Sequence, residues 1–110
     1  MKSNSKGKGR YGTGKYDTDW KRFPNPKDRL AFRILEGERR ISPEVSAAIY
    51  GMVNQLPPAE KEVIQLRVFE LLSYREVARR KGWYWNNVAF LEAQAIQRMR
   101  EWTATQLPDL

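Results

Sequence analysis

The sequence predicts a small all-α protein, a helical bundle preceded by a disordered basic tail. Apolar residues recur at helical spacing from Asn25 onward, and no stretch alternates convincingly as a strand would. Proline, serine and glycine stand where helices commonly begin and end. With 110 residues, of which 41% are hydrophobic and four are Trp, the chain is long enough for one domain with a real core.

The basic tail is predicted to cover residues 1–22, and the helical domain residues 23–110. Residues 1–22 hold seven Lys or Arg against two Asp, and "MKSNSKGKGRYGTGK" has no aliphatic residue after Met1, so it cannot offset the entropy cost of ordering. One interpretation of this segment is an arm that contacts phosphates non-specifically. The other is a tail that only increases solubility, or residues left over from cloning. The residues of such an arm are Lys2, Lys6, Lys8, Arg10 and Lys15, with Tyr11 available for stacking.

Five helices are expected after the tail. The first two open with a capping residue followed by proline, at Asn25 and at Ser42. The predicted spans are 25–37, 42–55, 56–72, 74–81 and a last helix from about residue 86 onward. A buried seam should join the last three helices through Val63, Leu66, Val77, Ala78, Val88, Leu91, Ile96 and Met99. Arg98 and Arg100 are expected at the C-terminal end of the last helix, where they compensate its dipole.

The absence of Cys and His excludes several functional classes. The chain has no disulfide, no thiolate metal site and no His-based catalysis, so we expect neither a metal nor another cofactor. Carboxylates such as Glu60 and Glu62 accompany no phosphate loop, nucleophile motif or metal-ligand spacing, and are interpreted as exposed surface charge. We therefore expect that the protein is not an enzyme.

The chain also lacks the signals of a membrane or secreted protein. No run approaches the ~18 apolar residues needed to cross a bilayer. The basic N-terminus is not followed by the apolar core of a signal peptide. We expect a soluble cytoplasmic protein without a membrane partner.

The stretch "LSYREVARRKGWYWNN", residues 72–87, begins as a helix-turn-helix motif does. Ser73 and Glu76 fit a capping box, Val77 and Ala78 fit the buried side of the helix, and Gly82 fits the turn. The next helix should be the reading helix, yet it opens on Trp83, Tyr84 and Trp85. These aromatics stand where base-contacting side chains are expected.

A resemblance covers about 45 of the 110 residues, from 56 to 100. "LPPAEKEVIQLRVFELLSYREVARRKG" and "LEAQAIQRMR" are similar to two successive stretches of region 4 of bacterial sigma factors, without a gap between them. The resemblance implies a compact four-helix unit with the helix-turn-helix at its C-terminal end. It also implies docking on RNA polymerase and binding of the upstream promoter element.

The departures from the sigma pattern fall on the reading helix. Where primary sigma factors typically present Arg, Glu, Arg and Gln, this chain has Trp85, Asn86, Ala89 and Phe90. Trp, Ala and Phe cannot make the bidentate contacts that discriminate guanine and cytosine. The family's promoter sequence is therefore not carried over to this chain.

Two interpretations of that helix stay open. In the first it reads A/T-rich DNA, with Asn86 or Asn87 bonded to adenine and Ala89 or Phe90 against a thymine methyl, although one of the two Asn is expected to cap the helix. In the second, an exposed Trp85 and Phe90 anchor a protein partner, while Trp83 belongs to the core.

Basic residues on the helix before the turn favour DNA. Arg75, Arg79, Arg80 and Lys81 lie where a helix-turn-helix crosses the DNA backbone, so they are candidates to hold phosphates; the alternative is a solvated face with ordinary surface pairing.

We therefore predict a DNA-binding transcription regulator that acts with or on RNA polymerase. The alternative is a mimic of sigma region 4 that mainly binds proteins, such as the polymerase, another regulator or a phage DNA-packaging assembly. Because no segment resembles the sigma module that melts promoters, we expect the protein to supplement or redirect a polymerase. The resemblance suggests an origin in a phage or mobile element.

Overall fold

The computed structural model describes residues 19–35 and 41–107, and the regular structure of these residues is entirely helical. The elements are η1 Trp20–Arg22, α2 Pro26–Leu35, α3 Pro43–Met52, η2 Val53–Gln55, α4 Pro58–Ile64, the π-helical η3 Gln65–Phe69, α5 Tyr74–Lys81 and α6 Trp85–Gln106. The predicted all-α class is confirmed. The predicted phosphate arm, with Lys2, Lys6, Lys8, Arg10 and Lys15, lies outside the described residues.

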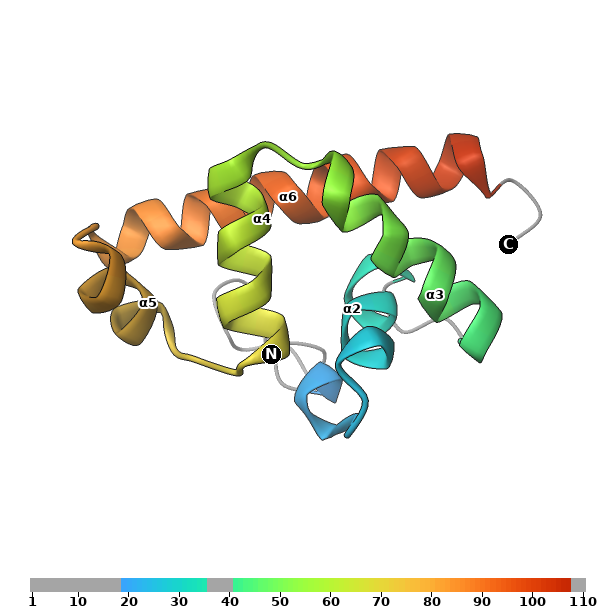
Figure 1. Ribbon diagram of the computed structural model, residues 1–110, viewed down its shortest axis with the longest axis horizontal. Helices are drawn as coiled ribbons and strands as arrows, with labels where there is room; N and C mark the ends of the chain where they lie inside the picture. Colours follow the sequence, from blue (N-terminus) through green and yellow to red (C-terminus); the bar gives the residue numbers. More distant parts are fainter. Residues whose placement is uncertain (1–18, 36–40, 108–110) are drawn as a thin grey trace, which may run out of the picture.

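The 22-residue helix α6 organises the other helices (Figure 1). It runs along the length of the molecule; α5 packs near its beginning, α4 crosses its middle, and α2 and α3 lie towards its later turns. Helices α2, α3, α4 and α5 all contact α6. Among the described residues, no helix is long and apolar enough to cross a membrane.

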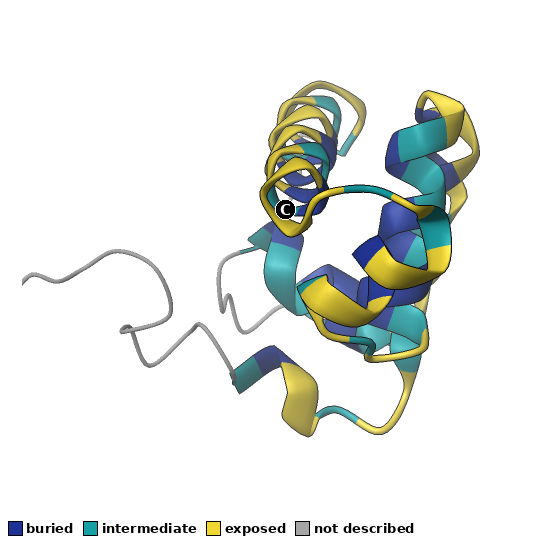
Figure 2. Cartoon of the chain, turned by 90° about the vertical axis from the view of Figure 1, so that its left-hand side faces the viewer, coloured by how far each residue is buried: buried dark blue, intermediate teal, exposed yellow. Residues whose placement is uncertain are grey.

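Two hydrophobic clusters form the core, and α4 lies between them. Val63 belongs to the smaller cluster with Val77 and Val88, whereas its neighbour Ile64 belongs to the larger one. In Figure 2 the buried residues gather on the sides of the helices that face one another. The larger cluster consists of Trp20, Leu30, Ala31, Ile34, Ile49, Met52, Val53, Leu56, Ile64, Val68, Ala95, Ile96 and Met99.

The predicted seam is confirmed in part and corrected in part. Val63, Leu66, Val77, Ala78 and Val88 form the smaller cluster, with Leu91 and Trp83 partly buried against it. The prediction was wrong to add Ile96 and Met99, which pack in the larger cluster. The reason is that α6 extends past α4 and α5, so its later turns meet α2 and α3 instead.

Trp20 shows that the core reaches into the segment predicted as tail. Its side chain is buried in the larger cluster, and the guanidinium groups of Arg33 and Arg67 lie 4.8 and 5.7 Å from the centre of its ring. The position of the boundary between tail and domain otherwise stays a prediction.

Arg29 of α2 stabilises the C-terminal end of η3. Its Nε donates to the carbonyl of Val68 at 2.8 Å, its Nη2 to that of Phe69 at 3.0 Å, and its Nη1 to that of Phe23 at 2.8 Å. Burial lowers the pKa of this guanidinium from its usual value by penalising the charged form. The contacts satisfy carbonyls that a helix end leaves without intrahelical donors.

Candidate nucleic-acid interface

The helix-turn-helix begins with the capping box that the sequence predicts. Ser73 Oγ accepts a hydrogen bond from the backbone nitrogen of Glu76 at 3.1 Å, and Glu76 Oε1 accepts one from the backbone nitrogen of Ser73 at 2.8 Å. The two bonds satisfy two backbone donors at the start of α5. The pKa of the Glu76 carboxyl is lowered first by its hydrogen bond from the Ser73 backbone, next by hydrogen bonding with the Ser73 side chain, and then by the positive charges of Arg79 and Arg80.

The turn after α5 is also as predicted. Gly82 closes the helix in the left-handed region at φ 73°, where a side chain would be strained. Its backbone nitrogen donates to the carbonyl of Ala78. The chain then leads directly through Trp83 into the reading helix.

The reading helix begins at Trp85, in agreement with the predicted start at about residue 86. Tyr84 is the N-cap and makes no side-chain capping bond. The expectation that Asn86 or Asn87 caps this helix is therefore wrong. Because both residues lie inside the first turn and are exposed, their amides are turned to solvent rather than committed to the helix end.

The four positions predicted to face bases share one side of α6. Trp85, Asn86, Ala89 and Phe90 span about 140° of the helix, given ~100° per residue. Trp85 is 50% exposed and Phe90 58%, as expected, while Ala89 between them is half-buried. We call these four residues the reading face. Tyr84, just before it, is 82% exposed.

The basic residues of α5 differ in how far they are engaged. Arg79 is exposed, and Arg75 is exposed with its guanidinium 6.0 Å from the centre of the Trp85 ring. Arg80 Nη1 lies 3.3 Å from Glu70 Oε1, and both side chains are more than half exposed. Lys81 Nζ lies 2.5 Å from Glu62 Oε2 of α4.

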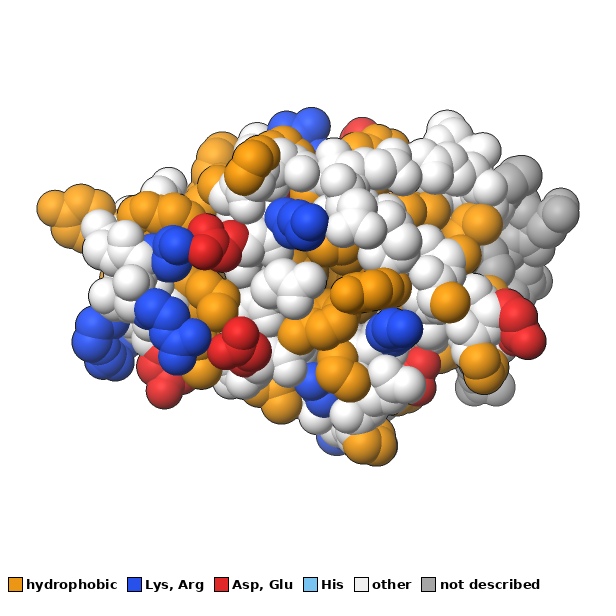
Figure 3. All heavy atoms as spheres, in the orientation of Figure 1, with side chains coloured by type: hydrophobic (Ala, Val, Ile, Leu, Met, Phe, Trp, Pro, Cys, Tyr) orange, Lys and Arg blue, Asp and Glu red, His pale blue; other side chains and the backbone are white. Residues whose placement is uncertain are grey.

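The surface around α5 therefore carries mixed charge. Figure 3 shows basic and acidic side chains next to one another over the α5 end of the molecule. Exposed ion pairs contribute little to the stability of a fold. The pair of Arg80 with Glu70 can therefore open at a small cost in free energy when a phosphate approaches. Of the four basic residues of α5, Arg79 is the one most readily available to a phosphate.

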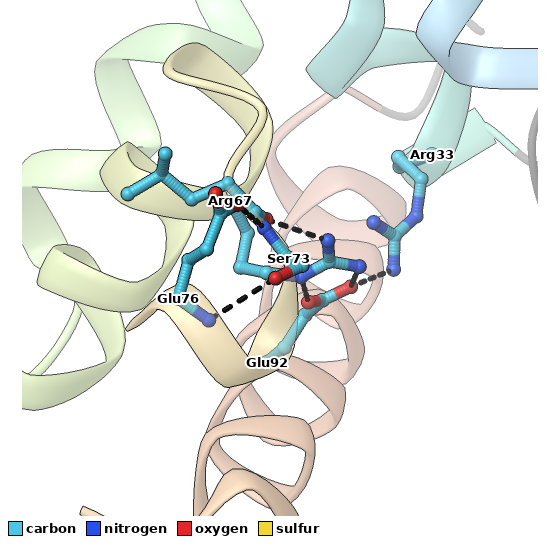
Figure 4. Close-up of polar contacts among 6 residues, drawn as sticks. Arg33, Arg67, Ser73, Glu76 and Glu92 are labelled. Carbon is cyan, nitrogen blue, oxygen red and sulfur yellow. Dashed lines mark hydrogen bonds and ion pairs between the residues drawn. The ribbon is translucent and has the colours of Figure 1, made fainter. Parts of the chain in front are cut away.

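A buried carboxylate at the back of the reading helix was missed by sequence reasoning. Glu92 is 2% exposed and lies 2.5 Å from Arg67 Nε and 2.7 Å from Arg33 Nη2 (Figure 4). Arg67 also donates to the carbonyl of Leu72 at 2.9 Å, just before the capping box. The three charged side chains thus join α2, η3 and α6 behind the motif.

One signal for Glu92 is present in the sequence. It falls four residues after Val88 and three before Ala95, in the register of the apolar side of α6. A carboxylate at such a position requires a cationic partner. That partner is not evident from sequence, because Arg67 is 25 residues away.

Two further interpretations are corrected. Glu60 is 3% exposed and accepts from Arg98 Nε at 2.9 Å, so it is not exposed surface charge. Arg98 and Arg100 do not compensate a helix end, because α6 continues to Gln106. Arg100 instead donates to the carbonyl of Arg33 at 3.0 Å.

The family comparison covers the site. Residues 46–90 match the family model described as Sigma-70, region 4, a match that begins within α3 and ends at the last residue of the reading face. Domains of this family bind promoter DNA and RNA polymerase and are not enzymes. No curated protein and no solved structure matches the chain significantly.

Proposed function

Because residues 46–90 are a Sigma-70 region 4 domain with a helix-turn-helix, we propose that the protein is a transcription regulator that binds DNA and acts with or on RNA polymerase in the cytoplasm. The observation that carries this proposal is that the family match includes both α5 and the exposed reading face. An origin in a phage or mobile element stays a prediction.

In this proposal α5 lies across the DNA backbone and α6 enters the major groove. Arg75 and Arg79 contact phosphates directly, and Arg80 and Lys81 exchange their glutamate partners for phosphates. Phosphate contacts set the position of the motif without reading sequence. The arm formed by Lys2, Lys6, Lys8, Arg10 and Lys15 adds affinity of the same unspecific kind.

A second candidate function is favoured by the exposed aromatics. Tyr84, Trp85 and Phe90 are large side chains at the tip of the motif, and aromatic side chains are enriched among the residues that dominate protein interfaces. In that case the protein binds RNA polymerase or another regulator through the reading face. DNA is then a minor partner.

Substitutions on the reading face, and of its neighbour Asn87, separate the two functions. If the helix reads bases, Asn86→Ala or Asn87→Ala should cost ~1–3 kcal/mol on a selected duplex and leave random DNA nearly unaffected. If it binds protein, Trp85→Ala should weaken capture of RNA polymerase by ~2 kcal/mol or more and spare DNA binding. Thr105→Ala, exposed near the far end of α6, is the matched control.

The measurement is a titration against labelled duplexes at several salt concentrations, beside a binding assay with purified RNA polymerase. Intact far-ultraviolet circular dichroism shows that each variant is folded. If Asn86, Asn87, Trp85 and Phe90 are all silent in both assays while the fold is retained, both functions assigned to the reading face are wrong.

A further inference from the structure

The reading face is unusual for a DNA-reading helix because it is largely apolar. The side chains of Ala89 and Phe90 have no hydrogen-bonding group, and Trp85 has only the single N–H donor of its indole ring. None of the three can make the paired hydrogen bonds with base edges that Arg, Glu or Gln make. Of the four residues, Asn86 alone has a side-chain amide, which both donates and accepts hydrogen bonds. The rings of Trp85 and Phe90 are nevertheless about half exposed.

The major groove offers such a face one kind of apolar group. Its floor carries hydrogen-bond donors and acceptors, and the methyl group at C5 of thymine is the only apolar group among the four bases. A cytosine methylated at C5 presents the same methyl group at the same place. Burial of a methyl against an aromatic ring removes apolar surface from water on both partners.

We propose that the reading face recognises C5-methyl groups of pyrimidines in the major groove, those of thymine or of 5-methylcytosine. This inference rests on the proposed function, since it requires that α6 enters DNA. Trp85 and Phe90 contact the methyl groups, and Ala89 between them leaves room for the pyrimidine edge. Asn86 bonds to an adenine next to a contacted thymine.

The neighbourhood of the face supports a DNA occupant. The guanidinium of Arg75 lies over the ring of Trp85, which places a positive charge at the edge of the apolar surface, and Arg79 is exposed on the same helix. Between residues 74 and 90 there are four basic residues and one acidic residue. A methyl-bearing groove bordered by phosphates complements apolar rings bordered by cations.

The test uses duplexes that differ only in C5-methyl groups. The full-length protein is titrated against alternating A·T and A·U duplexes, and against alternating G·C duplexes with cytosine or 5-methylcytosine. Uracil keeps every hydrogen-bonding group of thymine. The variants are Phe90→Ala and, as a control on the same helix, Thr105→Ala; a single-stranded oligonucleotide of equal length completes the set.

If the proposal is right, the A·T duplex binds more tightly than the A·U duplex, by about fourfold for each contacted methyl group. This factor corresponds to ~0.8 kcal/mol for burial of one such group. The 5-methylcytosine duplex should likewise bind more tightly than its unmethylated form. If only the A·T duplex or only the 5-methylcytosine duplex is preferred over its partner without the methyl group, methyl recognition is still supported. That result also shows whether thymine or 5-methylcytosine supplies the methyl group. Phe90→Ala should lose most of the preference, and Thr105→Ala should keep it.

Equal affinity for methylated and unmethylated duplexes overturns the inference and leaves the proposed function standing. Tighter binding of the single strand also overturns it, since the aromatics would then stack on unpaired bases. Absence of DNA binding, with binding of RNA polymerase through Trp85 and Phe90 retained, overturns the inference together with the DNA-binding function on which it rests.

Discussion

The Nη2 atom of Arg33 lies 2.7 Å from Oε2 of Glu92, which joins α2 to the reading helix from behind. Arg33 precedes the stretch that matches sigma region 4, and Glu92 follows its last residue by two positions. The pair therefore fastens a helix outside the family match onto the helix-turn-helix. Arg67 binds the same carboxylate and the carbonyl of Leu72, so it also positions the segment that leads into α5.

Replacement of Glu92 by Gln should destabilise the fold strongly. The amide keeps the shape of the side chain but leaves the guanidinium of Arg67, which is 9% exposed, without its counter-charge. Loss of one partner of a buried ion pair typically costs ~3–5 kcal/mol. Urea unfolding, followed by circular dichroism, measures the change in the free energy of unfolding.

Glu101→Gln is the matched control, because Glu101 lies exposed on the same helix and its carboxylate accepts a hydrogen bond from the neutral side chain of Gln97. Its effect should stay within ~0.5 kcal/mol. If Glu92→Gln also falls in that range, the carboxylate does not hold the three helices together.

The capping box predicts an acid-sensitive start of α5. Hydrogen bonds from Ser73, and then the charges of Arg79 and Arg80, lower the pKa of Glu76 below its ordinary value of 4.5. A lowered pKa in the folded state means that the ionised carboxylate stabilises the fold above the unfolded-state pKa. This contribution is lost as the pH falls below 4.5 and through the folded-state pKa.

Glu76→Gln tests this prediction, since glutamine can also serve in a capping box but does not ionise in this range. The thermal midpoint of the variant should fall less than that of the wild type between about pH 5 and about pH 3, a range that brackets the ordinary pKa of a glutamate. If the thermal midpoints of the two proteins fall in parallel as the pH is lowered, the charge of Glu76 does not contribute to stability.

The local parts of the site were predictable from sequence because their partners are neighbours in the chain. Ser73 bonds Glu76 three residues on, and Gly82 adopts the turn conformation that glycine favours. The exposure of Trp85 and Phe90 followed from their positions in the sigma pattern. The N-cap of α6 was not predicted: it is Tyr84 rather than Asn86 or Asn87, although asparagine is a common capping residue.

The parts that sequence did not predict depend on contacts between distant residues. Glu60 and Arg98 are 38 residues apart, and neither has a local feature that marks it as a buried partner. Trp20 falls in the segment predicted as basic tail because its neighbours in the chain are polar, yet it is buried in the larger cluster, with Arg33 of α2 and Arg67 of η3 against its ring. Helix periodicity gives the buried side of a helix but not the helix that covers it.

The basic residues of α5 should contribute unequally to DNA binding. Arg79 is exposed, whereas Lys81 is half-buried with its Nζ 2.5 Å from Glu62 Oε2, so Lys81 must leave that pair to reach a phosphate. Arg79→Ala should therefore weaken binding of all sequences and reduce the slope of log affinity against log salt by about 1. Lys81→Ala should change the slope less, and an equal or larger change for Lys81 would contradict this order.

Deletion of residues 2–15 should lower affinity for all DNA sequences about equally. The five basic residues of that segment are dispersed among Gly, Ser and other polar residues, a composition that can meet phosphates but does not hold a base-reading geometry. Each phosphate contact that is lost should reduce the salt slope by about 0.9. A full-length variant with Gln in place of Lys2, Lys6, Lys8, Arg10 and Lys15 separates charge from chain length. It should behave like the deletion, whereas wild-type affinity and slope in both variants would show that the segment does not touch DNA.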